Sequence, residues 1–249
     1  MSETWKYEYI TRVVFEPSIG RHNILLRCLP AREVFQHSQE ETFILSEGFW
    51  HKESQDGFGN RIISGGTSER HATMEFRSSG LLKTSTYCIP DANPHPAFSL
   101  QQETASLPPL PLLTGEGFLA DILAIMHYVN GYLQYSPGTT DINTPLEQVL
   151  QTRKGVCQDY AHLMIALCRQ AGHPARYVCG LMKGEGHTHA WVEVHDGQCW
   201  YAFDPTNDTA IASGYIKLAH GRHAQDCPVS RGTFIGCAQQ TTIITTNVK

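Results

Sequence analysis

The chain has 249 residues, which at roughly 100–200 residues per domain suits one large domain or two modest ones. An apolar fraction of 41%, a charged fraction of 17% and a net charge of −5 are those of a globular protein, and they exclude a disordered chain or a basic nucleic-acid-binding one. The N-terminus has no apolar signal-peptide core, and no uncharged run approaches the roughly 18 residues that span a bilayer. We therefore expect a cytoplasmic protein with no membrane partner and with mostly free thiols among its eight cysteines.

The first hundred residues carry the period of β-strands. From Trp5 to Phe15, aromatic and apolar residues alternate with mostly polar ones, which predicts a strand with one buried face. Short apolar runs follow at 23–26, 42–45 and 61–63, separated by turns such as Asp-Gly-Phe-Gly-Asn at 56–60. Short strands with Gly-rich turns predict an N-terminal all-β sandwich or barrel over residues 1–100.

A proline-rich stretch, residues 90–111, separates two kinds of pattern. It cannot continue a helix or a strand, so we place a domain boundary there and assign residues 101–249 to a second domain.

Three helices are predicted beyond this boundary. An apolar stripe covers 118–129, and Thr144-Pro145-Leu146-Glu147 has the residues of an N-cap, a first helical position and a capping box. A third helix begins near Cys157 and ends at Gly172. Apolar residues cover most of its circumference, so we expect it to be the buried central helix.

Strands follow the third helix at 176–182, 190–195 and 198–203, and a last strand at 241–246 closes the chain. Helices followed by an antiparallel sheet predict an α+β fold for the second domain.

The sequence Gly155-Val156-Cys157-Gln158-Asp159 puts Cys157 at the first turn of the central helix. The unpaired N–H groups and the helix dipole favour a negative charge there, and Arg153 and Lys154 act in the same sense. A cysteine is otherwise a small core residue, which is what we expect of Cys168 on the apolar stripe. Cys157 is therefore the candidate nucleophile.

His189 and Asp204 are linked by a predicted hairpin. Asp196-Gly197 between two alternating runs indicates a two-residue type I′ turn, in which His195 opposes Gln198. The same register places His189 opposite Asp204 on one face, with Cβ atoms roughly 4.5–5.5 Å apart. A carboxylate there would accept the imidazole N–H and leave the other ring nitrogen to face a thiol.

A cysteine at a helix start, then a histidine on a strand, then an acid on the next strand is the order of papain-like catalysis. Three blocks also resemble those of the bacterial transglutaminase-like superfamily: residues 155–162, 189–194 and 204–206. The resemblance implies a transglutaminase-like cysteine protease core with Cys157, His189 and Asp204 as the catalytic triad.

The resemblance extends outside these blocks. Residues 56–60 look like a turn of the family's N-terminal β-region, and 135–140 with 144–146 match the approach to the nucleophile. Residues 221–232 are similar to the segment before the last strand, except that His223-Ala224 stands where an aspartate and an aromatic residue are expected.

An oxyanion site and a substrate cleft are also expected. The backbone N–H of Cys157 is the first oxyanion donor, and the resemblance suggests a polar or aromatic second donor upstream of the cysteine. Trp191 has an alternative interpretation as a core aromatic, and Asp159 is better explained as a helix-start carboxylate than as a catalytic acid. The candidates for the oxyanion site and the cleft are Gln134, Tyr135, Gln158, His187 and Trp191.

Two other classes of function are open. His187 and His189 with a cysteine offer zinc ligands, but no Cys-x-x-Cys or His-Glu-x-x-His run is present, so we expect no metal and no cofactor. A non-catalytic interaction module is the other class, and the presence of all three triad residues argues against it.

The expected activity is acyl transfer through a thioester, with a peptide, a protein or another amide as substrate. Animal transglutaminases use a tryptophan to stabilise the oxyanion, and none lies between Phe118 and Cys157. This difference favours hydrolysis over amine transfer to a protein glutamine, which is the alternative.

Overall fold

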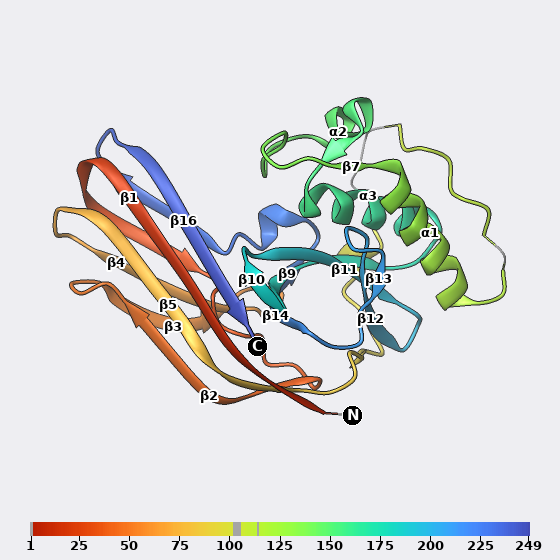
Figure 1. Cartoon of the computed structure of the whole chain (residues 1–249), viewed down its shortest axis with the longest axis horizontal. Helices are drawn as coiled ribbons and strands as arrows, with labels where there is room; N and C mark the ends of the chain where they lie inside the picture. Colours follow the sequence, from red (N-terminus) through yellow and green to blue (C-terminus); the bar gives the residue numbers. More distant parts are fainter. Residues whose placement is uncertain (1, 102–105, 114) are drawn as a thin grey trace.

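The computed structural model describes residues 2–101, 106–113 and 115–249. The fold is sheet-rich with few helices, and an eight-stranded sheet lies beside a smaller sheet that carries the helices on one face (Figure 1). Within the described ranges, none of the helices has the length and apolar character needed to cross a membrane.

The eight-stranded sheet is antiparallel and is organised by its first strand. Its strands are β1 (Glu3–Leu26), β2 (Gln36–Leu45), β3 (Trp50–Gln55), β4 (Arg61–Thr67), β5 (His71–Thr84), β10 (Gly184–Gly186), β15 (Ser230–Ile235) and β16 (Gln239–Val248). The first half of β1 lies between β5 and β16, and its last residues lie between β4 and β15. The predicted alternation is confirmed, since every second residue from Trp5 to Phe15 is buried.

The last strand has a different partner from the one expected. We predicted that it closes the second domain, but β16 pairs with β1 along ten positions and with β10 at its end. The amide of Lys6 donates to the carbonyl of Lys249, so the two chain ends lie side by side. The division of the chain near residue 100 stays a prediction, and the C-terminal strands belong to the first sheet.

The second sheet contains β6 (Ile89–Pro90), β9 (Ala175–Met182), β11 (His189–His195), β12 (Cys199–Asp204), β13 (Thr209–Ala210) and β14 (Tyr215–Gly221). The helices are α1 (Phe118–Tyr132), α2 (Leu146–Thr152) and α3 (Cys157–Gln170), with two short 3-10 turns, η1 (Pro96–Phe98) and η2 (Ala224–Asp226). A two-stranded parallel ladder joins β7 (Gln134–Tyr135) to β8 (Lys154–Gly155). This helix-on-sheet arrangement agrees with the α+β expectation, although strands dominate the whole chain.

The central helix forms as predicted. Helix α3 packs on β9 and β11 and is covered by α1 and α2, and ten of its fourteen residues are buried. Gly172 adopts a φ of 87° just past its end, which is the left-handed conformation that ends many helices. The predicted cap of α2 is wrong, because the helix starts one residue later with Pro145 at the cap. Thr144 instead exchanges hydrogen bonds with Asp141 in the preceding loop.

The hairpin between β11 and β12 forms, but its register differs from the prediction. His195 pairs with Trp200, so a four-residue loop at 196–199 replaces the two-residue turn. The carboxylate of Asp196 accepts the N–H groups of Gln198 and Cys199, which stabilises this longer loop. The register of β11 and β12 differs by two residues from the predicted one. Every cross-strand pair therefore changes, but each side chain stays on its predicted face of the sheet.

A cluster of buried charges holds the second sheet together. The fully buried carboxylate of Glu193 accepts hydrogen bonds from the Tyr87 hydroxyl at 2.6 Å, the Lys217 ammonium at 3.0 Å and the Arg176 guanidinium. Lys217 also contacts Glu33 at 2.7 Å. Burial alone would raise the pKa of Glu193, but the charges of Arg176 and Lys217 outweigh it and lower that pKa.

Replacing this carboxylate should destabilise the fold severely. Glu193→Ala leaves the buried charges of Arg176 and Lys217 without their shared partner, and we expect a loss of about 3–5 kcal/mol in the free energy of unfolding. Urea denaturation at pH 7 measures it, with Glu40→Ala at an exposed position of β2 as the control, expected within about 0.5 kcal/mol of the parent chain. Equal losses in the two variants would contradict the role assigned to Glu193.

Candidate active site

Cys157 is placed by a capped helix start. The Asp159 carboxylate, itself buried, accepts the backbone N–H of Val156 at 2.7 Å and the Thr140 hydroxyl at 2.6 Å. A Cβ at position 155 would lie 2.7 Å from the Asp159 side chain, so Gly155 permits this close approach. The interpretation of Asp159 as a helix-start carboxylate is confirmed. As the first residue of α3, Cys157 also presents an N–H that has no helical carbonyl to bond.

His189 and Asp204 meet across the hairpin despite the changed register. Nε2 of His189 donates to Oδ2 of Asp204 at 2.8 Å, and the Asp204 side chain is fully buried. The observed pairing makes the two residues diagonal neighbours rather than direct partners, on the same face of the sheet.

Asp204 is held by more groups than His189 alone. Its Oδ2 also accepts from the Tyr215 hydroxyl and the Asn207 side-chain amide, each at 2.7 Å, and its Oδ1 accepts the backbone N–H groups of Thr206 and Asn207. The sequence analysis did not identify Asn207 or Tyr215 as site residues. The turn residues Pro205-Thr206-Asn207 directly after the aspartate were a usable signal for Asn207, whereas nothing local pointed to Tyr215 on β14.

His189 and Cys157 line the same cleft, and the Cys157 thiol is part of the electrostatic surroundings of the imidazole ring. Burial lowers the pKa of His189, but the hydrogen bonds and negative charges of Asp204 and Cys157 outweigh it and raise the pKa to about 10. The pKa of Asp204 is lowered, because the hydrogen bonds from His189, Asn207 and Tyr215 outweigh its burial. These surroundings favour a protonated imidazole ring beside an ionised carboxylate.

A cleft of about 150 Å³ opens at the sulfur. Cys157, Gln158 and His189 lie on one part of its wall, and Tyr177, Pro228 and Val229 contribute an apolar part. None of its lining residues is an aspartate, glutamate, lysine or arginine. The cleft therefore suits an uncharged group such as an amide.

The sequence-predicted cleft residues separate into different positions. Gln158 lines the cleft, whereas Gln134 and Tyr135 lie on β7, beside β8 and its continuation to the cysteine. Tyr135 is exposed, and burial and the charge of Cys157 raise the pKa of its hydroxyl. His187 is exposed in the turn before β11.

Trp191 is not a cleft residue. It is fully buried, donates to the Tyr87 hydroxyl at 3.3 Å and packs edge-on against Tyr215. Its alternative interpretation as a core aromatic is the correct one. His162 on α3 is also held inside the structure, because its Nε2 accepts the N–H of Ala224 and burial lowers its pKa to about 4.

Across the described ranges, no group of three or more His, Cys, Asp or Glu side chains has an arrangement able to hold a metal ion. His189 is already committed to Asp204 and Cys157. The geometry therefore gives the zinc alternative no support.

Comparison with known proteins gives a family match for part of the chain and a similar fold. Residues 115–205, which include Cys157, His189 and Asp204, match the sequence model of the transglutaminase-like superfamily. A solved structure from Cytophaga hutchinsonii, of a protein proposed to be a cysteine protease, covers 100% of this chain and 92% of its own with a TM-score of 0.78. At 22% sequence identity, this likeness establishes the fold alone.

Curated relatives match over shorter regions. An uncharacterized protein of Mycobacterium leprae is 34% identical over 125 residues, which are 46% of this chain and 44% of that protein. A protein-glutamine gamma-glutamyltransferase of Pseudomonas aeruginosa is 34% identical over 100 residues, which are 33% of this chain and 15% of that protein. The chain spans less than half the length of these curated relatives.

The charge state of His189 should depend on Asp204. Asp204→Asn removes the carboxylate that stabilises the imidazolium, and we expect the pKa of His189 to fall by about 1–3. An NMR titration of isotope-labelled histidine from pH 5 to 11 measures it. Asp208→Asn, at a neighbouring carboxylate that contacts His127, is the control and should leave His189 unchanged.

The Asp204→Asn substitution should also change how the free energy of unfolding depends on pH. Because the folded pKa lies above the ordinary value of about 6.5, the stabilisation from protonated His189 is complete below that pH and is lost as the pH rises toward 10. The free-energy difference between the parent chain and Asp204→Asn should shrink over this window. A constant difference would mean that His189 is not charged through Asp204.

Proposed function

We propose that this transglutaminase-like superfamily protein is a cysteine-dependent acyl-transfer enzyme that hydrolyses a peptide or another amide bond. The observation that carries the proposal is the position of His189, which is held by Asp204 on one side and faces Cys157 on the other, at a cleft without other charged side chains.

The proposed reaction begins with transfer of the Cys157 thiol proton to His189, and the resulting thiolate attacks the amide carbonyl carbon. Negative charge then develops on the carbonyl oxygen, to which the N–H of Cys157 at the start of α3 would donate a hydrogen bond, with the Gln158 side chain on the same cleft. Collapse of the tetrahedral intermediate breaks the C–N bond. The imidazolium of His189 gives its proton to the departing amine, and a thioester remains.

Hydrolysis of the thioester reverses these roles. His189, now neutral, takes a proton from a water molecule as the oxygen attacks the thioester carbonyl. The acid product leaves and the sulfur is released beside the reformed imidazolium. Throughout, the five hydrogen bonds that Asp204 accepts keep it ionised and keep the ring oriented.

The first test is the reactivity of the sulfur. Cys237, which is exposed, is an internal reference in the same chain. We expect iodoacetamide at pH 6 to alkylate Cys157 at least about 10-fold faster than Cys237, because ordinary thiols hold little thiolate at that pH. Labelled peptides are quantified by mass spectrometry over time.

The matched variant is His189→Ala, which removes the charge that stabilises the sulfur anion and should bring the rate at Cys157 down to that of Cys237. Equal, slow labelling of both cysteines in the parent chain would overturn the proposal and favour a non-catalytic interaction module.

The second test separates hydrolysis from amine transfer, which remains the alternative because the matching Pseudomonas aeruginosa protein is a glutamyltransferase. A peptide that acylates Cys157 is incubated in ¹⁸O-labelled water with a fluorescent primary amine. We expect an acid product carrying one ¹⁸O atom to exceed the fluorescent amide, since no tryptophan precedes the cysteine as an oxyanion donor between residues 118 and 157. Predominance of the amide would instead identify a transferase.

A further inference from the structure

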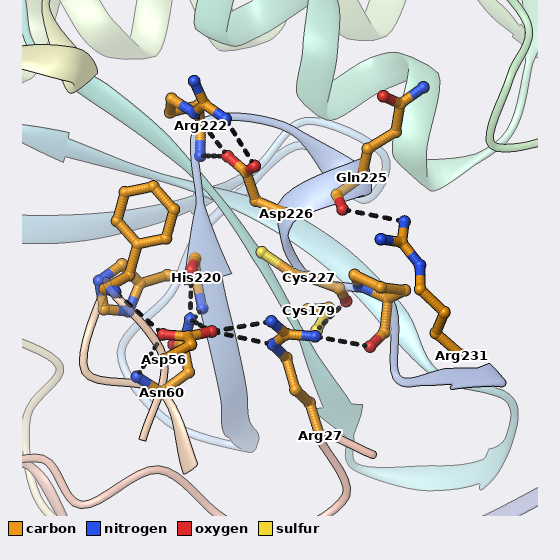
Figure 2. A network of polar contacts seen from close by, with 12 residues as sticks. Arg27, Asp56, Asn60, Cys179, His220, Arg222, Gln225, Asp226, Cys227 and Arg231 are labelled. Carbon is orange, nitrogen blue, oxygen red and sulfur yellow. Dashed lines mark hydrogen bonds and ion pairs between the residues drawn. The ribbon is translucent and has the colours of Figure 1, made fainter. Parts of the chain in front are cut away.

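Two sequence blocks that contain none of the three residues proposed for the triad meet in space. Residues 56–60 form the turn between β3 and β4, and residues 221–232 run from the end of β14 to β15. The side-chain amide of Asn60 donates to the carbonyl of His220 at 2.7 Å and accepts the His220 N–H at 2.8 Å (Figure 2). The turn between β3 and β4 of the first sheet is thereby attached to β14 of the second sheet.

A cavity of about 440 Å³ lies between these blocks. Three arginines line it, Arg27 directly after β1, Arg222 directly after β14 and Arg231 from β15, together with the carboxylates of Asp56 and Asp226. The whole chain has a net charge of −5, so an excess of positive charge in one cavity runs against the general balance.

Asp56 has no acceptor capacity left for a ligand. Its Oδ1 accepts the N–H groups of Phe58 and Asn60, and its Oδ2 accepts Nε and Nη2 of Arg27 and the Asn60 side-chain amide, all within 3.0 Å (Figure 2). The pair is largely shielded from solvent, with side-chain exposures of 10% for Arg27 and 14% for Asp56. This ion pair therefore braces the cavity.

The carboxylate of Asp226 is likewise occupied by hydrogen bonds within the protein. Its two oxygens accept Nε and Nη2 of Arg222 at 2.8 Å, and Oδ2 also accepts the Arg222 backbone N–H. Both carboxylates of the cavity are thus already paired with arginines.

Once Asp56 and Asp226 are paired, the arginine N–H donors of the cavity outnumber its free acceptors. A guanidinium has five N–H donors, and Arg231, which is exposed, donates from Nη2 to the Gln225 carbonyl at 3.4 Å, at the long end of the range (Figure 2). Nη1 of Arg27 makes a similarly long contact, 3.4 Å, to the Pro228 carbonyl. A group rich in acceptors and negatively charged would satisfy these donors, and a planar carboxylate fits a guanidinium through two parallel hydrogen bonds.

The cavity and the cleft share one wall. Along residues 222–231, Arg222, Asp226 and Arg231 line the cavity, whereas Cys227 and Val229 line the cleft. His162 on α3 accepts the Ala224 N–H and holds this wall against the helix that begins with Cys157. A substrate bound in the cleft therefore has the cavity on the other side of one short segment.

We propose that this cavity binds a carboxylate of the acyl substrate, from an acidic side chain or from a peptide C-terminus, through Arg231 with Arg27. The proposal rests on the proposed function, because it takes the neighbouring cleft as the place of the amide. The uncharged cleft binds the amide that reacts. The cavity on the other side of residues 222–231 selects substrates that carry a carboxylate.

The experiment uses peptides that carry an N-terminal iodoacetyl group, with glutamate or glutamine at each of the next few positions and an amidated C-terminus. A second set has no acidic side chain and ends in a free carboxylate or an amide. The rate of Cys157 alkylation is measured by mass spectrometry and divided by the rate with iodoacetamide for the same variant.

We expect at least one acidic peptide to react about 10-fold faster than its neutral partner, the scale of a charge-assisted hydrogen-bonded pair. Arg231→Gln should reduce this ratio to below about 2, and Arg231→Lys should retain part of it. Arg12→Gln, at an exposed arginine on β1, is the matched control and should leave the ratio unchanged. The two sets show whether a side chain or a C-terminus supplies the carboxylate.

The failures are distinguishable. Fast alkylation of Cys157 with equal rates for acidic and neutral peptides at every position would overturn the carboxylate site and leave the proposed function standing. A ratio that persists in Arg231→Gln would also overturn it. Alkylation of Cys157 no faster than that of Cys237 with every probe would overturn both.

Discussion

The buried carboxylate of Glu193 is the interaction on which the second sheet depends. It lies in the middle of β11 and neutralises Arg176 from β9 and Lys217 from β14. Separating unlike charges in a water-free interior is costly, so the three strands cannot slide past one another without leaving a charge unpaired. His189 lies four residues earlier on the same face of β11, and the position of its ring follows from this constraint.

In the candidate site, too, a buried carboxylate fixes the groups that lie closer to solvent. Asp204 is fixed by five hydrogen bonds, it fixes and charges His189, and the imidazolium in turn faces the half-buried sulfur of Cys157. Asp204 is fully buried whereas His189 and Cys157 are half-buried and line the cleft, so the carboxylate that supports the ring lies in the core. A preorganised arrangement of this kind spends little free energy on reorientation when charge moves during a reaction.

The wall between the cleft and the arginine-lined cavity connects the site to the first sheet. Residues 222–231 are held by His162 from α3 and by Arg27, which directly follows β1. Strand β1 itself is held by β16, the last strand of the chain. The N-terminal β-region therefore shapes the surroundings of the cleft even though it contributes none of the three residues proposed for the triad.

The sequence by itself determined the local elements and the face on which each key residue lies. Alternation along 189–195 and 199–204 placed His189 and Asp204 on one face even though the turn was misjudged, because a slip of two residues preserves the face of a strand. Only the tertiary structure decided the length of that turn, the burial of Trp191, the hydrogen bond from Tyr215 and the pairing of β16 with β1. Periodicity and capping act over a few residues, whereas these features depend on which strand edges and buried polar groups need partners once the cores have packed.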